Sequence, residues 1–104
     1  MIEETLNILS NGSRREITYN LLESESEELH IRDLEKFLVE ETDIESNRVY
    51  LELVHMHLPK MEEHGIINYD RDRGIVAYDA DETVEDLISQ IRELEQRYGD
   101  SSEL

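Results

Sequence analysis

Histidines and carboxylates are the side chains of this 104-residue chain that could bind a metal or act in catalysis. On a helix, His55 and His57 would lie about 200° apart around the axis, so the two rings cannot chelate one ion. His57 and His64 would share a face but lie about 10 Å apart along it. The chain has no cysteine, which excludes thiolate metal sites, disulfides and cysteine nucleophiles. Because no nucleophile–base arrangement stands out either, we expect neither an enzyme nor a bound metal or cofactor.

The basic side chains are few and unevenly distributed. Ten Lys and Arg residues stand against 27 Asp and Glu residues, for a formal charge of -17, and only Lys36 and Lys60 are lysines. Residues 1–47 carry a net charge of -9, residues 48–78 carry -1, and residues 79–104 carry -7. A uniformly acidic surface does not predict this gap, so we look for function in the middle segment.

Three interpretations account for the charge. A DNA mimic or an acidic interaction tail would carry it, and so would a surface adapted to molar salt, where the Debye length falls to about 3 Å. Disorder fits the charge but not the regular apolar spacing. We favour the high-salt interpretation, because low lysine with high Asp and Glu resembles the proteins of halophilic archaea.

Length and hydropathy predict one small domain without a membrane partner. Hydrophobic residues make up 38% of the chain, enough for one modest core. No apolar run approaches the roughly 20 residues needed to span a bilayer. The first ten residues, MIEETLNILS, lack the basic and apolar regions of a signal peptide. We therefore expect a soluble, cytoplasmic protein.

Apolar spacing predicts the elements that position the charged side chains. In the first half of the chain we expect a helix over Ile2–Leu9 and a second from Ser13 to about Glu23, opened by a capping box of Ser13 and Glu16. Strand-like alternation around His30 precedes a third helix, which reaches about Glu41.

A longer helix follows, reaching about His64. Thr42 with Glu45, or Ser46 alone, can cap it. Its apolar positions form two overlapping rows, which predicts burial on more than one side. Pro59 removes one backbone donor, so we expect a kink or a loosened turn near His55.

Two strands and a last helix complete the pattern. Gly65 ends the long helix, and Ile66–Tyr69 and Ile75–Tyr78 are predicted strands of a hairpin whose tip spans residues 70–74. Thr83, with Asp86 three residues on, is the predicted start of a helix that ends at about Tyr98. Residues 100–104 are expected to be a frayed tail.

Helix, short strand, helix, long helix and hairpin is the element order of a winged helix-turn-helix domain. The stretch HLPKMEEHGII, from His57 to Ile67, resembles the end of the recognition helix and the start of the wing in ArsR-like regulators. The longer string HLPKMEEHGIINYDRDRGIV, together with SNGSRR from Ser10 to Arg15, resembles an uncharacterised family of haloarchaeal winged-helix domains.

The resemblance covers roughly residues 6 to 78 and implies the architecture. It implies a mainly α fold with a small β-hairpin, in which a winged helix-turn-helix domain over residues 1–80 precedes an amphipathic dimerisation helix over residues 81–99. In that family pattern, His57 packs under the wing.

The resemblance also implies that the long helix enters the DNA major groove. Such a helix should expose polar side chains towards its N-terminal half. Arg48 can read guanine or bind a phosphate, Asn47 can pair with adenine, and Glu52 can accept from cytosine. The alternative is an ordinary solvated helix face. The expected DNA-facing residues are Asn47, Arg48, Leu51, Glu52 and His55.

Two further arginine pairs are candidates for DNA contact. Arg71 and Arg73 suit a wing that reaches phosphates or the minor groove, although alternating charge at a hairpin tip also serves solubility. Arg14 and Arg15 at a helix start oppose the helix dipole. Either phosphate contact or pairing with nearby acids would explain that placement.

The last predicted helix carries an apolar seam that indicates self-association. Its members recur at spacings of three and four residues over about two heptads, as in a coiled coil. The alternative is a helix folded back on its own domain, because two heptads are marginal alone. The seam consists of Val84, Leu87, Ile91, Leu94 and Tyr98, widened by Ile88.

Our leading hypothesis is a homodimer that binds double-stranded DNA sequence-specifically and regulates transcription in a salt-rich cytoplasm. Its rival is a winged-helix interaction module, or a DNA mimic, whose acidic surface binds another regulator. The nearly neutral middle segment favours the first hypothesis, and the overall charge of -17 favours the second. No sequence feature identifies an effector ligand.

Overall fold

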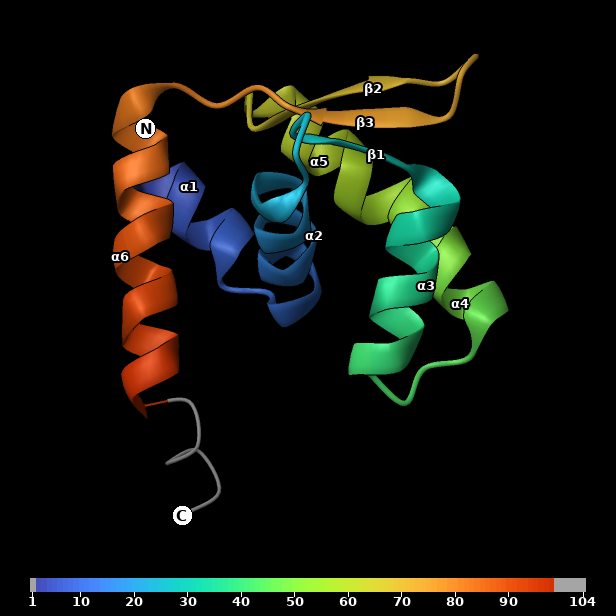
Figure 1. Ribbon diagram of the computed structural model, residues 1–104, viewed down its shortest axis with the longest axis horizontal. Helices are drawn as coiled ribbons and strands as arrows, with labels where there is room; N and C mark the ends of the chain where they lie inside the picture. Colours follow the sequence, from blue (N-terminus) through green and yellow to red (C-terminus); the bar gives the residue numbers. More distant parts are fainter. Residues whose placement is uncertain (1, 99–104) are drawn as a thin grey trace.

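Helices make up most of the computed structural model, which describes residues 2–98, and a small antiparallel sheet of three strands completes it (Figure 1). Residues 1 and 99–104, which include the expected tail, lie outside the described part. The elements in chain order are α1 (Ile2–Leu9), α2 (Gly12–Glu23), β1 (Glu28–His30), α3 (Ile31–Glu41), α4 (Ser46–Glu52), the π-helical turn η1 (Leu53–His57), α5 (Leu58–Glu63), β2 (Ile67–Asp70), β3 (Ile75–Tyr78) and α6 (Glu82–Tyr98).

Two helices begin earlier than the sequence predicts. Asn11 caps α2, its side chain accepting the backbone N–H of Arg14 at 3.2 Å, so the predicted capping box at Ser13 is wrong. Asp81 caps α6 by accepting the N–H of Val84 at 3.0 Å, so the predicted start at Thr83 is also wrong. Asn and Asp are strong caps, and each lies one position before the first helical residue.

Residues 46–63 form one long helix interrupted by the π-helical turn. In that turn the N–H of Leu58 bonds back five residues to the carbonyl of Leu53. Pro59 has no N–H with which to continue the regular ladder. The loosened turn predicted near His55 is therefore confirmed, and the long helix is α4, η1 and α5 joined end to end.

The predicted caps of the long helix are wrong. Thr42 instead closes α3, its N–H and hydroxyl both donating to the carbonyl of Leu38, at 2.9 and 2.8 Å. Ser46 donates its hydroxyl to the carboxylate of Glu35 at 2.6 Å, so it joins α4 to α3 instead of capping its own helix.

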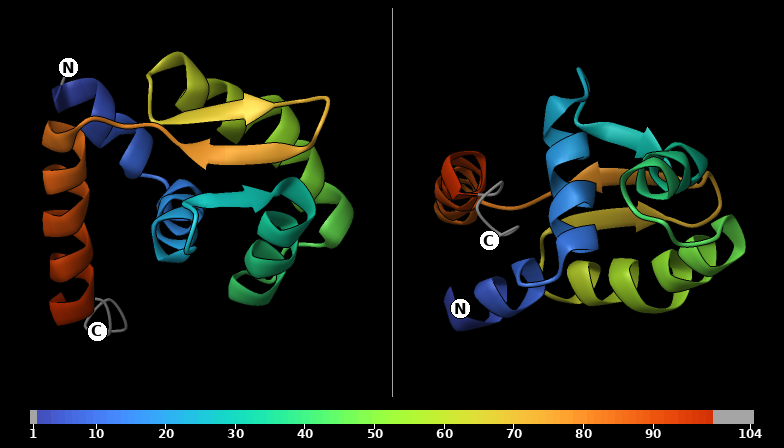
Figure 2. Two further views of the ribbon diagram at one scale, coloured as in Figure 1. Left: turned by 45° about the horizontal axis from the view of Figure 1, so that its top comes forward. Right: turned by 90° about the horizontal axis from the view of Figure 1, so that it is seen from below.

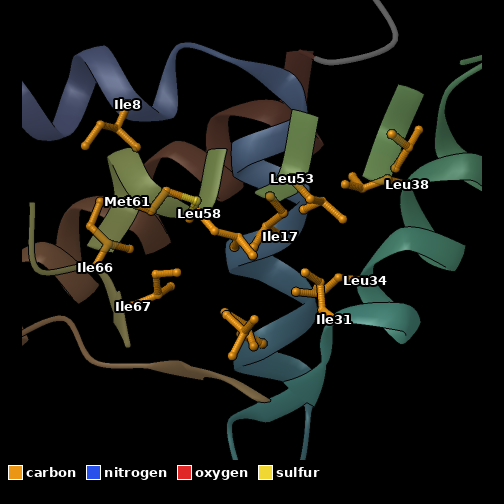
Figure 3. Close-up of a cluster of buried hydrophobic side chains, with 13 residues drawn as sticks. Ile8, Ile17, Ile31, Leu34, Leu38, Leu53, Leu58, Met61, Ile66 and Ile67 are labelled. Carbon is orange, nitrogen blue, oxygen red and sulfur yellow. The ribbon is translucent and has the colours of Figure 1, made fainter. Parts of the chain in front are cut away.

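The hydrophobic core is built around the long helix. Val49, Leu53 and Leu58 are buried on it, and Ile8 and Ile17 reach it from α1 and α2. Figure 3 shows these helices and α3 directing apolar side chains into one cluster, with strand β2 closing it. Burial on more than one side of the long helix is thus confirmed.

The hairpin is fixed to the start of α3. Strand β3 pairs with both β2 and β1, in the order β1–β3–β2. The N–H of Ile31 donates to the carbonyl of Gly74 at 2.8 Å, and the ring of His30 covers Gly74. Gly74 has φ +69°, and a Cβ there would lie 2.8 Å from His30 Nε2, so two separate constraints require glycine.

Helix α6 folds back on α1 and α2, at the opposite end of the molecule from the hairpin tip (Figures 1 and 2). Ile88 is buried against Leu9 and Tyr19, with Val84 and Ile91 packed beside it. These three members of the predicted seam are thus used within the chain. No helix in residues 2–98 is long and apolar enough to cross a membrane.

We expect Leu58→Ala to lower the free energy of unfolding by about 2–5 kcal/mol, because it removes a fully buried side chain from the core. Leu51→Ala on the same long helix is the matched control. Its side chain is 56% exposed, so the change should stay within about 0.5 kcal/mol. Denaturant titration in high salt measures both, and equal losses would contradict this core.

Candidate nucleic-acid interface

Helix α4 and the hairpin tip, residues 71–74, lie at the same end of the molecule (Figures 1 and 2). The structure thus brings together two of the candidate groups that the sequence singles out. On the long helix, Asn47, Arg48, Leu51 and His55 are exposed, as predicted. Glu52 is only half-buried, so it also faces solvent in part. We call this surface the candidate face. It consists of the exposed residues Asn47, Arg48, Leu51 and His55 of the long helix and Arg71 and Arg73 of the hairpin tip.

Arg48 is the basic side chain of α4. Its side chain is 71% exposed, and its guanidinium pairs with the carboxylate of Glu52 one turn later, at 3.1 Å. An exposed pair of this kind is worth little in water, so another ligand can displace it at small cost. Glu52 therefore orients Arg48 along the helix surface without burying it.

Two apolar side chains add to this surface. Leu51 is 56% exposed, and Met56, which the sequence analysis missed, is 44% exposed in the π-helical turn. A regular 3.6-residue period cannot place Met56 correctly, because the π-helical turn changes the phase of the helix. Exposed apolar groups on a polar helix face can contact thymine methyl groups.

The hairpin tip holds its two arginines differently. Arg71 pairs with Glu62 of α5 at 3.1 Å and lies over the ring of Tyr69, 4.8 Å from its centre. Arg73 is exposed, and its guanidinium forms no ion pair within residues 2–98. Asp70 shapes the turn, since its carboxylate accepts the backbone N–H groups of Asp72 and Arg73, at 3.1 and 3.2 Å.

Glu62 connects the long helix to the hairpin, a role that the sequence analysis missed. Besides Arg71, its carboxylate accepts the backbone N–H of Tyr69 at 3.2 Å. The two partners follow Glu62 by seven and nine residues, across the turn at Gly65, so no helical or strand period marks the contact. Gly65 makes that turn possible with φ +72°.

Arg14 and Arg15, for which the sequence left phosphate contact and pairing with acids as alternatives, both have partners within the chain. Arg14 is buried and donates through Nε to the carbonyl of Ile8 at 2.7 Å. Arg15 donates to the carbonyl of Leu9 at 2.8 Å and pairs with Glu95 at 2.9 Å. The two guanidiniums therefore bind the last carbonyls of α1, where the helix dipole favours cations.

Arg32 is a cation whose role the sequence did not predict. It lies in the first turn of α3, with its guanidinium 4.0 Å from the centre of the Tyr50 ring on α4. It also donates to Glu35 at 2.9 Å. Hydrogen bonds from Ser46 and then Arg32 hold the pKa of Glu35 below its ordinary value. This cluster fixes the packing of α3 beside α4.

The acidic segments are not both remote from the candidate face. Helix α6, which carries five of the nine acids and both arginines of the -7 segment, lies at the far end of the molecule (Figure 2). Helix α3 belongs to the -9 segment but packs directly against α4. Asp43 and Glu45, in the connection between these helices, are exposed immediately before Asn47. Local carboxylates therefore lower the electrostatic potential at this end.

His57 lies in the π-helical turn, beside Arg14 of α2, and is only 2% exposed. Its Nδ1 is 3.4 Å from Nη1 of Arg14, which joins the long helix to the start of α2. Burial and then the Arg14 charge lower the pKa of His57, against a weaker opposing effect of Glu52. Within residues 2–98, no three His, Asp or Glu side chains are arranged to hold a metal ion.

These features define a small, mainly helical protein with a three-stranded antiparallel sheet and an exposed face formed by one helix and a hairpin tip. A family model described as Domain of unknown function (DUF7344) matches residues 6–77, more than half of the chain. The chain belongs to this family. No curated protein and no solved structure matches it.

We expect acid to destabilise the protein through His57. The folded state holds its pKa below the ordinary 6.5, so the unfolded state binds more protons and stability falls as the pH drops from about 7.5 to about 5.5. His57→Gln keeps an acceptor for Arg14 but does not titrate, so its unfolding free energy should fall less. His55→Gln, which replaces an exposed histidine, is the control. If the unfolding free energies of wild type and His57→Gln fall in parallel with pH, His57 is not the source of the acid sensitivity.

Proposed function

We propose that this protein binds double-stranded DNA sequence-specifically as a winged helix-turn-helix regulator of transcription. The observation that carries this proposal is the candidate face, where Arg48 and Asn47 on the long helix and Arg71 and Arg73 at the hairpin tip are exposed at one end of the molecule. In this proposal the long helix is the recognition helix and the hairpin is the wing.

The element order supports the winged-helix assignment. Helix α2, strand β1, helix α3, the long helix and the β2–β3 hairpin follow one another in the order of that domain class. We further propose that the protein is ArsR-like and of haloarchaeal origin, on the strength of the sequence resemblance at His57–Ile67 and Ser10–Arg15. Its few lysines and charge of -17 support a salt-rich cytoplasm as its environment.

Each exposed group has a distinct task in the proposal. Arg48, released from Glu52, donates to guanine or to a phosphate, and Asn47 pairs with adenine. Leu51 and Met56 contact thymine methyl groups. The wing arginines bind phosphates or enter the minor groove, which positions the domain without setting the sequence preference. No catalytic step is part of this function.

The affinity for DNA should depend on salt concentration differently from that of a basic DNA-binding protein. Counterion release favours DNA binding less as the bulk salt rises. The carboxylates of α3 and of Asp43 and Glu45 repel phosphates, and salt screens that repulsion. Short-range hydrogen bonds and apolar contacts remain in molar salt. Binding should therefore depend weakly on KCl, or strengthen with it.

The acids near the candidate face also support a second proposal, in which the domain binds another regulator or mimics DNA. Asp43 and Glu45 beside Asn47 are the observation that favours it, because they place negative charge where phosphates would approach. Under this proposal, DNA affinity is absent at all salt concentrations, and a basic protein partner occupies the same face.

We expect Arg48→Ala to weaken DNA binding by about 1–3 kcal/mol and to relax the sequence preference, because it removes a base contact. Arg73→Ala and Arg71→Ala should weaken binding with less effect on preference. Sites selected from a random DNA library, followed by fluorescence anisotropy between about 0.2 and about 2 M KCl, measure both quantities.

Arg97→Ala is the matched control for these substitutions. Arg97 is also exposed and also pairs one turn away, with Glu93 at 3.0 Å, but it lies on α6. Its loss should leave affinity unchanged. If Arg97→Ala costs as much as Arg48→Ala, binding is diffuse; if no substitution matters, the interaction-module proposal replaces the DNA-binding one.

We also propose that the protein forms a homodimer through the exposed end of α6. With Val84, Ile88 and Ile91 packed within the chain, Leu94 and Tyr98 remain 52% and 57% exposed, while Leu87 is half-buried. Exposed apolar side chains of this size on one helix favour association. Two paired domains would also read two half-sites.

Leu94→Asp should convert the dimer to a monomer, because it places a charge in the proposed apolar contact. Gln90→Asp, one turn earlier and also exposed, adds the same charge and should leave the dimer intact. Light scattering in about 2 M KCl measures the mass. A monomeric wild type, or a Leu94→Asp protein of unchanged mass, would refute this interface.

A further inference from the structure

A groove of about 570 Å³ lies between α1, the end of α5 and the start of α6. Val84 and Leu87 of α6 give it apolar walls, and Gly65 lies at its edge where α5 turns into the sheet. This volume falls within the range of about 300–1,000 Å³ that is typical of small-molecule sites. The groove lies on the opposite side of the fold from the candidate face, so it is independent of the proposed DNA contacts.

Carboxylates line this groove without Lys or Arg to balance them, and the lining also includes the ring of His64, whose Nδ1 lies 2.9 Å from the carbonyl of Lys60. Glu4, Glu63 and Asp79 contribute from three different elements or connections, and Asp81 lies beside them. None of the first three forms an ion pair with Lys or Arg in the part of the chain that the structure describes. No Lys or Arg lines the groove. The groove therefore combines an apolar wall with carboxylates that no Lys or Arg in its lining neutralises.

Charge complementarity decides which occupant fits. A second copy of this chain would bring a net charge of -17 to the acidic rim, and the C-terminal residues 99–104 carry two further acids and no base. Nucleic acid fits poorly because this groove, unlike the candidate face, has no Lys or Arg in its lining to bind phosphates. A metal ion alone would leave Val84 and Leu87 without contact, and no metal-binding arrangement occurs among residues 2–98.

We propose that this groove binds an amphipathic organic cation, a small molecule with an apolar body and at least one positive charge. The apolar body packs against Val84 and Leu87, which removes their exposed surface from water. The charge lies among Glu4, Glu63 and Asp79, where the attraction is stronger than in bulk water. The site is a property of the groove and does not depend on DNA binding.

Two ions of the same size and shape but opposite charge provide the test. Tetraphenylphosphonium should bind with a single saturable site and shift amide resonances of the groove residues, measured by calorimetry and by ¹H–¹⁵N spectra in NaCl. Tetraphenylborate should bind at least about ten-fold more weakly. Equal affinities would show adsorption to apolar surface alone, and shifts outside the groove would place the cation elsewhere; either result overturns the proposal.

Substitutions of the groove carboxylates distinguish binding at this site from non-specific attraction to an acidic protein. The double variant Glu63→Gln with Asp79→Asn should weaken phosphonium binding at least about five-fold while the circular dichroism spectrum stays unchanged. Glu40→Gln with Asp33→Asn removes the same two charges from exposed positions on α3 and should have no effect. If both pairs weaken binding equally, the cation only joins a diffuse ion atmosphere and the proposed site is refuted.

Discussion

Burial of one long helix is the constraint on which the rest of the fold depends. A chain with a net charge of -17 repels itself when it becomes compact, and only 38% of its residues are hydrophobic. The apolar sides of residues 46–63 contact α1, α2, α3 and the sheet together, so one helix supplies the centre of the core. Because Leu53, Leu58 and Met61 are fully buried, displacement of this helix would expose the core on every side at once.

The same burial determines which side chains are left for function. With Val49 and Leu53 directed inward, Asn47, Arg48 and Leu51 must face solvent. The π-helical turn ends immediately before Pro59, which has no N–H to donate, and the helix continues through α5 beyond it. The apolar periodicity of this helix therefore decides both which side chains are buried and which are exposed. The periodicity shifts at the π-helical turn, which begins at Leu53.

The order and type of the elements could be predicted from the sequence, because apolar periodicity, glycine and proline are local signals. The cap of α2 could not, since Asn11 and Ser13 are both competent caps and nothing local distinguishes them. The roles of Arg14 and Glu62 could not be predicted either, because tertiary packing brings their backbone and side-chain partners near. The inward packing of α6 depends likewise on α1 and α2, far earlier in the chain.

The attachment of the hairpin to α3 has a consequence for how its tip meets any partner. The Ile31–Gly74 hydrogen bond and the His30 ring over Gly74 hold the tip to the first turn of α3, and the Asp70 carboxylate accepts backbone N–H groups of the turn. Such a loop loses little conformational entropy when it is contacted, because its backbone is already ordered. Preorganisation of this kind favours a long residence time over adaptability, so the tip is suited to one partner surface of fixed shape and poorly suited to several.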